Sequence, residues 1–188
     1  RARATGTDVT SRQLYFPDTA ILITRFMTHD GVGEVVDFMP PAGKQPTAND
    51  RILRMMRCVR GRISFEVDIA PRFDYGRESH ETHLTEDGLV FQGVAGTAMT
   101  VNLILEPDDE RLAQAHVDAH GDVHAEVTLT AGQMRGLVLE TGAAGPVRRI
   151  RVAEAQRLFD ETVDYWESWL GRSTYHGRWR EALNRSAI

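Results

Sequence analysis

The sequence predicts a mainly β fold, an antiparallel β-sandwich followed by a helical tail. Three observations indicate this. From Leu14 to about Glu140, apolar residues recur at every second position, which is the period of strands with one buried and one solvated face. Glycine-containing turn signals separate these runs. After residue 146 the apolar residues recur every three or four positions, which is typical of a helix.

The clearest strands are residues 63–69, 99–105 and 123–130. In the first, Ile63, Phe65, Val67 and Ile69 alternate with less apolar residues, and the other two show the same pattern. Less regular strands are expected at residues 20–27, 34–39, 51–59, 89–93 and 135–140. About eight strands with one apolar face each must bury that face against a second sheet, so a sandwich is the expected arrangement.

Glycine-containing dipeptides stand between the predicted strands. Each can supply the positive φ that a hairpin turn requires, and no helical pattern intervenes, so neighbouring strands are expected to pair antiparallel. The dipeptides are Asp30-Gly31, Arg60-Gly61, Asp87-Gly88, His120-Gly121 and Ala131-Gly132.

A helix is predicted from about Val152 to Leu170, with Gly171 positioned to end it. Ser173 and Thr174 could cap a second helix from about Gly177 onward. We therefore divide the chain into a sandwich domain (1–146), a linker helix (147–174) and the start of a helical domain (175–188). Because the sequence opens with Arg1 and stays helix-forming to its last residue, we expect both ends to be cut.

The composition excludes some classes of protein. Asp and Glu number 27 against 22 Lys and Arg, and the resulting net charge of −5 disfavours nucleic acid as a partner. The sequence contains no run of about 20 apolar residues that could span a bilayer. Cys58 is the only cysteine, so no disulfide can form within one copy. We expect a cytoplasmic protein with Cys58 packed in its core.

The histidines are candidate metal ligands. His80 and His83 are too close in sequence for the zinc-peptidase signature, and in a strand they would point to opposite faces. His116, His120 and His124 recur every four residues, but Gly121 interrupts any helix there. We interpret all of them as solvated loop and strand residues and predict no metal and no cofactor.

Other candidate groups are interpreted as structural. Residues 148–151 form a short basic cluster, expected to be the solvated entry to the helix. Trp166 and Trp169 lie on the predicted apolar stripe and are expected to be buried, whereas Tyr165, Tyr175 and Trp179 have no assigned role. No pair among Asp37, Asp74, Glu161 and Asp164 has a spacing that places both carboxylates in one cleft. We therefore predict no catalytic or cofactor-binding residue.

Several segments, in their order along the chain, resemble the N-terminal part of bacterial glycoside hydrolase family 15, the glucoamylase and trehalase-like enzymes. No single segment is diagnostic, but their joint order over most of the chain is fairly specific. They are Gln13-Leu-Tyr-Phe-Pro17, Gly33-Glu-Val-Val-Asp-Phe-Met-Pro-Pro41, Arg57-Cys-Val-Arg-Gly61, Pro71-Arg-Phe-Asp-Tyr-Gly-Arg77, Tyr165-Trp-x-x-Trp169, Ser173-Thr-Tyr175, Gly177-x-Trp179 and Asn184-Arg-Ser-Ala187.

The resemblance implies an N-terminal super-sandwich, a linking helical segment and a catalytic barrel of six helix pairs. It further implies that the first strands are missing before Arg1, so that the sandwich is incomplete, and that residues 175–188 begin the barrel. The family's two catalytic glutamates lie in the barrel, beyond Ile188, so no catalytic residue carries over to this chain.

The leading hypothesis is a structural domain of an exo-acting, inverting α-glucoside hydrolase, with the catalytic barrel of the same chain as its partner and no activity of its own. The alternative is a free-standing carbohydrate-binding or protein-interaction module. A third hypothesis is that the sandwich forms a homo-oligomer through its edge strands.

Overall fold

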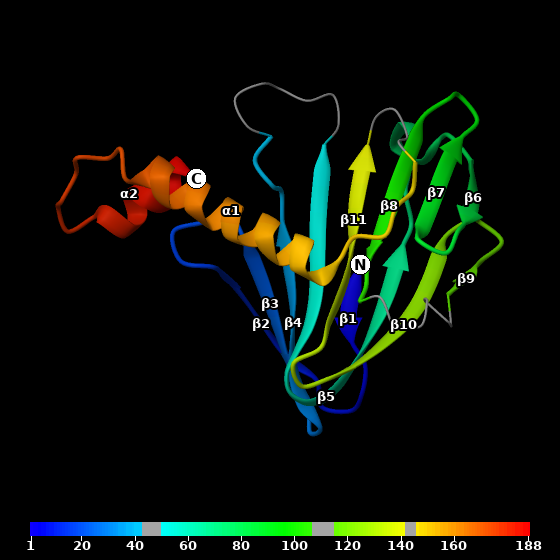
Figure 1. The fold of residues 1–188 in the computed structure, drawn as a ribbon, viewed down its shortest axis with the longest axis horizontal. Coiled ribbons are helices and arrows are strands. Elements are labelled where there is room, and N and C mark those ends of the chain that lie inside the picture. Colours follow the sequence, from blue (N-terminus) through cyan, green and yellow to red (C-terminus); the bar gives the residue numbers. More distant parts are fainter. Residues whose placement is uncertain (43–49, 107–114, 142–145) are drawn as a thin grey trace.

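The computed structural model describes residues 1–42, 50–106, 115–141 and 146–188. These residues form a β-sandwich followed by helices, which confirms the predicted fold class (Figure 1). The elements are β1 (Ala2–Ala4), β2 (Thr10–Tyr15), β3 (Leu22–Met27), β4 (Gly31–Phe38), β5 (Arg51–Ile69), the 3-10 helix η1 (Asp74–Gly76), β6 (His80–Leu84), β7 (Gly88–Gly93), β8 (Ala98–Ile104), β9 (His116–Val117), β10 (Val123–Thr130), β11 (Met134–Thr141), α1 (Val152–Leu170) and α2 (Arg180–Ala187).

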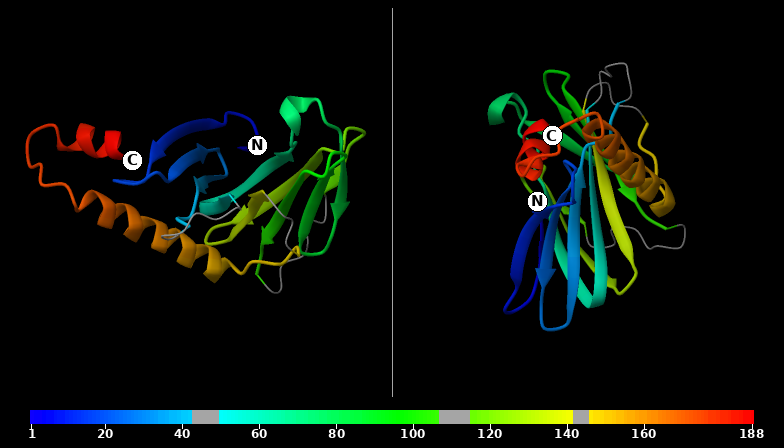
Figure 2. Two further views of the ribbon diagram at one scale, coloured as in Figure 1. Left: turned by 90° about the horizontal axis from the view of Figure 1, so that it is seen from above. Right: turned by 90° about the vertical axis from the view of Figure 1, so that its left-hand side faces the viewer.

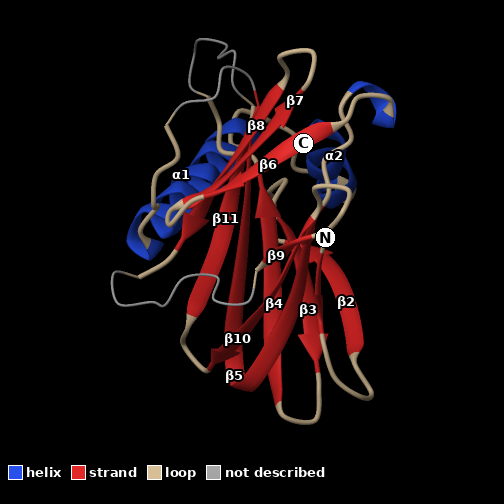
Figure 3. Ribbon diagram, turned by 90° about the vertical axis from the view of Figure 1, so that its right-hand side faces the viewer, coloured by secondary structure: helices blue, strands red, loops and turns tan. Residues whose placement is uncertain are grey.

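The two sheets share strand β5. In the larger sheet the order is β2-β3-β4-β5-β11-β8-β7-β6, and in the smaller sheet β5 pairs with β1 and β10, while β9 pairs with β10. The first part of β5, up to Gly61, pairs with β4 and β11. The second part, from Arg62, pairs with β10. The body is therefore one continuous set of antiparallel strands bent into two layers (Figure 3).

The expectation of a hairpin turn at Arg60-Gly61 is wrong. Both residues lie inside β5, which runs unbroken for 19 residues. Gly61 has a φ of +70°, and this conformation bends the strand out of one sheet and into the other without reversing its direction. A sequence signal for a turn thus marks a corner within one strand. The Asp30-Gly31, Asp87-Gly88 and His120-Gly121 signals do fall between paired antiparallel strands. Ala131-Gly132 joins β10 to β11, which pair with different parts of β5 and not with each other, so the hairpin expected there is also wrong.

The main core lies between the two sheets. The alternation predicted for residues 63–69 and 123–130 is confirmed, since Phe65, Val67, Val127 and Leu129 are buried here. Phe26 and Phe65 meet edge to face, with ring centroids 6.0 Å apart. Cys58 is buried in the same cluster, as expected. Its thiol lies 3.5 Å from the Arg60 carbonyl oxygen, and burial raises the pKa of the thiol.

A second core lies between the larger sheet and α1, which crosses the outer face of that sheet (Figures 1 and 2). Phe159 of α1 packs edge to face against Phe16 and Phe38, with ring centroids 5.4 and 5.8 Å away. Ala155 is fully buried beside them. The helix is therefore an integral part of the packed body.

The expectation that one face of the strand at residues 99–105 is solvated is wrong. From Thr100 to Leu105 every residue is buried, polar Thr100 and Asn102 included. The segment leading into α1 runs over this strand, and Ile104 forms a parallel bridge with Ile150. The Asn102 side chain accepts a hydrogen bond from the Arg148 backbone, which satisfies a polar group under that cover.

The connection to the second helix departs from the sequence expectation. The second helix begins at Arg180, and its first turn has no side-chain cap. The expected cap from Ser173 or Thr174 is therefore wrong. Instead, the hydroxyl of Ser173 accepts from the backbone of Tyr175 within the connection. The first helix ends where expected, before Gly171.

Replacement of Phe159 by Ala is expected to lower the free energy of unfolding by about 3–5 kcal/mol, because it empties the contact between α1 and the sheet. Urea unfolding followed by circular dichroism measures this loss. Glu167→Ala, at an exposed position of the same helix, is the matched control and should change the free energy by less than about 0.5 kcal/mol. Equal effects of the two substitutions would show that α1 does not depend on this contact.

Candidate functional site

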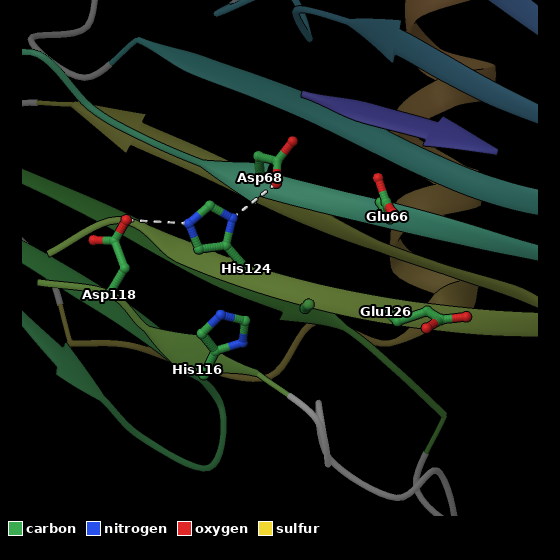
Figure 4. A pocket seen from close by; sticks show the side chains of 7 residues that line it. Glu66, Asp68, His116, Asp118, His124 and Glu126 are labelled. Carbon is green, nitrogen blue, oxygen red and sulfur yellow. Dashed lines mark hydrogen bonds and ion pairs between the residues drawn. The ribbon is translucent and has the colours of Figure 1, made fainter. Parts of the chain in front are cut away.

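An open depression of about 540 Å³ lies on the outer face of the smaller sheet (Figure 4). Its walls come from β5, β9 and β10, three strands from different parts of the chain. Most of the lining side chains carry a carboxylate or an imidazole, and they are Glu66, Asp68, His116, Asp118, His124, Ala125 and Glu126.

Strand register explains why these side chains meet. His124 lies directly opposite Asp68 of β5 and His116 of β9, and Glu126 lies opposite Glu66. Side chains two residues apart on a strand share a face. Because Val123 and Val127 turn inward to the core, the intervening charged side chains turn outward together.

His124 is the centre of the cluster. Its Nδ1 lies 2.9 Å from Oδ1 of Asp68, and its Nε2 lies 3.3 Å from Oδ2 of Asp118. The ring of His116 stacks beside it, with centroids 5.2 Å apart. The hydrogen bond to Asp68, followed by the one to Asp118, raises the pKa of His124, because both carboxylates favour the protonated ring.

Asp118 is itself fixed by the turn that follows it. Its Oδ1 accepts hydrogen bonds from the backbone N–H groups of His120 and Asp122, at 2.8 and 3.0 Å. The bond from His120 is the main cause of the lowered pKa of Asp118. The carboxylate is thus held in one orientation, with its second oxygen toward His124 (Figure 4).

A second ionic contact anchors the same turn from the other side. Arg72, which follows β5, donates to both oxygens of Asp122 at 2.7 and 2.6 Å. Asp122 is 7% exposed, and its pKa is lowered chiefly by these hydrogen bonds. On strand β6, Thr82 donates to the Gly121 carbonyl at 2.6 Å, and the His80 ring lies 3.2 Å from the same oxygen. The turn between β9 and β10 is therefore tied to two further segments.

The contacts of this cluster hold separate segments of the chain together. Both nitrogens of His124 face carboxylates, so neither is left to accept a proton from a substrate. Glu66 is paired with Arg3, 2.6 Å away. Within the part of the chain that the structure describes, no three side chains of metal-ligating type lie close enough to hold an ion.

This cluster was not predicted, because the sequence pattern indicates that His116 and His124 are separate solvated residues. The two stand symmetrically about His120, and an antiparallel pair folded about that turn places them opposite each other. That symmetry was a signal available in the sequence. His83, by contrast, is exposed as expected, and its ring lies 3.9 Å from Glu81.

The candidate carboxylates do not come together. Asp37 pairs with Arg54 at 2.7 Å, and Asp74 pairs with Arg77. Glu161 lies one turn after Arg157 on the surface of α1, and Asp164 is exposed on the same helix.

The basic cluster lies at the start of α1, as the sequence indicated. Arg148 forms two hydrogen bonds with Glu154 in the first turn of α1, at 3.1 and 2.7 Å. Arg149 lies 3.2 Å from Asp87. Arg151 is the residue immediately before the helix. These pairs account for Arg148 and Arg149.

Several large side chains of the tail are exposed, and the expected burial of Trp169 is wrong. Trp169 is 41% exposed, and its Nε1 donates to the Ala187 carbonyl at 3.0 Å, while Trp166 is half-buried beside a small groove below α1. The helix is amphipathic, but its last turns extend past the edge of the sheet and have no strand beneath them (Figure 2). We define the aromatic surface as Tyr165, Trp169, Tyr175, Trp179 and Leu183.

α2 contacts the sandwich at the connection between β2 and β3. Asn184, which is buried, donates to Asp18 at 3.1 Å, and Arg185 donates to the Thr19 carbonyl while lying over the Tyr15 ring. Neither helix in the described residues is long and apolar enough to cross a membrane.

These features define a β-sandwich module with an attached helical arm, in which ionic clusters fasten strands and loops. Comparison with protein families matches residues 3–166 to the trehalase-like N-terminal domain. The chain therefore belongs to the trehalase-like N-terminal family, in agreement with the resemblance drawn from its segments.

Two relatives align with nearly the whole chain. A trehalase from Thermoplasma volcanium is 23% identical over 184 residues, which is 97% of this chain and 28% of the relative. A trehalase from Thermoplasma acidophilum is 24% identical over 180 residues, which is 94% of this chain and 29% of the relative. The chain thus spans less than a third of the length of these relatives. Both are archaeal, so a bacterial origin stays a prediction.

Among solved structures, one named for a kojibiose phosphorylase from the human microbiome overlays on 99% of this chain and 26% of its own, at 9% identity and with a TM-score of 0.46.

Replacement of Arg72 by Gln is expected to lower the free energy of unfolding at pH 7, because it leaves the buried carboxylate of Asp122 without its charged partner. Since the pKa of Asp122 is lowered in the fold, the stability from this pair is present above the ordinary carboxyl pKa of about 3.9 and is lost as the pH falls through the lower folded value. Urea unfolding between pH 7 and pH 3 should show the two proteins converging.

The control is Arg77→Gln, which breaks the exposed pair with Asp74 and should change the free energy by less than about 0.5 kcal/mol. A loss in Arg72→Gln that stays constant across this pH range would contradict the assignment.

Proposed function

We propose that this chain is the structural N-terminal module of an exo-acting α-glucoside hydrolase of the trehalase or glucoamylase type, in glycoside hydrolase family 15. The observation that carries the proposal is the match of residues 3–166 to the trehalase-like N-terminal family, with two trehalases aligned over nearly the whole chain. The ionic clusters of the sandwich support a structural role.

In this proposal catalysis belongs to the rest of the polypeptide. One carboxylic acid there protonates the leaving oxygen, and a carboxylate on the other face of the sugar activates water, which inverts the anomeric configuration. Neither residue lies in this chain. The sandwich contributes rigidity, and the helical arm leads toward the catalytic part.

The aromatic surface is the proposed contact with that catalytic part. Trp179 is 61% exposed and Trp169, Tyr165 and Leu183 each more than 40%. Such a cluster of large apolar side chains is typical of a protein contact surface. Three of these residues, Tyr175, Trp179 and Leu183, lie on the segment 175–188, where we propose that a helical barrel begins, so the occupant we favour is the remainder of the same chain. The module is further proposed to work in the cytoplasm.

The first test is the activity of the full-length parent. We expect glucose release from trehalose, maltooligosaccharides or isomaltooligosaccharides, with the β-anomer formed first when the reaction is followed by proton NMR. Inactivity on all three substrate classes contradicts the proposed activity. Initial release of the α-anomer contradicts the inverting mechanism alone.

The second test uses the 188-residue chain by itself, which is expected to release no glucose from any of these substrates. Turnover by the pure chain would overturn the structural role. Calorimetric titration with glucans separates the rival hypothesis, because micromolar binding to the chain alone favours a carbohydrate-binding module. Light scattering of the chain and its parent shows whether either forms an oligomer.

The third test concerns the aromatic surface. Trp179→Ser is expected to leave the 188-residue chain within about 0.5 kcal/mol of the unsubstituted chain, because the ring contacts mainly solvent and Arg178 there. In the parent, the same change should lower the unfolding free energy by about 2–4 kcal/mol, because the ring is then buried at the contact. Tyr75→Ser, at a 93% exposed residue, is the control. An unchanged parent would place the contact elsewhere.

A further inference from the structure

The cluster around His124 carries an inference that does not depend on the proposed function. We propose that His124 is a pH-sensitive latch, which in its protonated form fastens the short strand β9 to strand β5. The claim rests on the position of one imidazole between two carboxylates from segments far apart in sequence, Asp68 and Asp118 (Figure 4).

The chemistry of imidazole sets the two states. A protonated ring donates from both nitrogens, so it can bond Asp68 and Asp118 at once. A neutral ring has one N–H and one lone pair, so it can donate to only one carboxylate. In that state a lone pair faces the oxygen of the other carboxylate, and one of the two links is lost.

The hydrogen bond between His124 and Asp118 is the one expected to break. Its separation from His124 is 3.3 Å, against 2.9 Å for Asp68, which makes it the longer link. Asp68 extends from the long central strand β5, whereas Asp118 follows a strand of two residues whose register pairs are with β10 alone among the described residues. Loss of the link therefore affects β9 before it affects β5.

The charged groups around His124 influence its protonation. Asp68 and Asp118 bond its two nitrogens, and His116 stacks on its ring. Glu66 and Glu126 line the same depression, and His120 acts on Asp118. The carboxylates favour the protonated ring, although Arg3 neutralises Glu66. The hydrogen bonds to Asp68 and then to Asp118 are the main causes of the raised pKa of His124.

The direction of the switch follows from linkage. A histidine whose pKa is raised in the fold stabilises the fold fully below its ordinary pKa of about 6.5, and this contribution is lost as the pH rises through the higher folded value. The latch is therefore closed in mildly acidic solution and opens on the alkaline side of 6.5.

The change is confined to a short segment. The turn after Asp118 stays anchored, because the ion pair of Arg72 with Asp122 and the hydrogen bond from Thr82 to Gly121 do not titrate in this range. We expect residues 115–117 to loosen, and with them one wall of the depression.

Hydrogen exchange measured by mass spectrometry tests this proposal on peptides covering residues 115–118, from about pH 5.5 to 8.5, after correction for intrinsic rates. We expect the protection factor of this segment to fall about threefold or more across the range, whereas peptides from β4 and β11 stay constant. A flat profile in the unsubstituted chain overturns the proposal.

His124→Gln, whose side chain does not titrate, should remove the pH-dependent step, and His83→Gln on exposed β6 should keep it. A step that persists in His124→Gln assigns the effect to another group and also overturns the proposal. If that variant unfolds, Asp68→Asn provides the second test. It removes the shorter link, so the step should move to lower pH, and an unmoved step would contradict the latch.

Discussion

The structure depends on the corner that β5 makes at Gly61. There the backbone of the strand passes so close to the β3–β4 turn that a Cβ at Gly61 would lie 2.1 Å from the Asp30 carbonyl oxygen, and one at Gly31 would lie 2.5 Å from that of Arg62. The hydrogen bond from Arg62 to Asp30 and that from Ala131 to Gly61 fix the corner from both sides. Two glycines thus allow one strand to serve two sheets, and both cores are assembled around it.

The sequence predicted much of the fold, and its errors have identifiable physical causes. Alternation located the strands that face the core between the sheets, because a two-residue period is local information. The corner at Gly61 was mistaken for a hairpin turn, since positive φ serves both and only the partner strands distinguish them. The burial of Asn102 could not be predicted, because its side chain meets the backbone of Arg148, which lies far along the chain.

The cluster around His124 was within reach of the sequence, whereas its contacts were not. Symmetry about His120 could have placed His116 opposite His124, but the approach of Asp68 depends on the register of β10 with β5. The exposure of Trp169 was also unpredictable, because an apolar stripe shows which side chains seek a contact and not how far the sheet beneath them extends. The family resemblance supplied what local patterns could not, and the match to the trehalase-like N-terminal family agrees with it.

This chain is thus a sandwich whose central strand links two sheets, one of which supports the arm that carries the aromatic surface. The most direct measurement of this account compares Gly61→Ala with Gly132→Ala by urea unfolding. Both glycines have positive φ, +70° and +86°, but nothing lies within 4 Å of a Cβ at Gly132. Gly132→Ala should therefore lose only the conformational cost of about 1–2 kcal/mol. Gly61→Ala should lose about 3 kcal/mol or more beyond that, because the new Cβ meets backbone. Equal losses would contradict the central role of the corner.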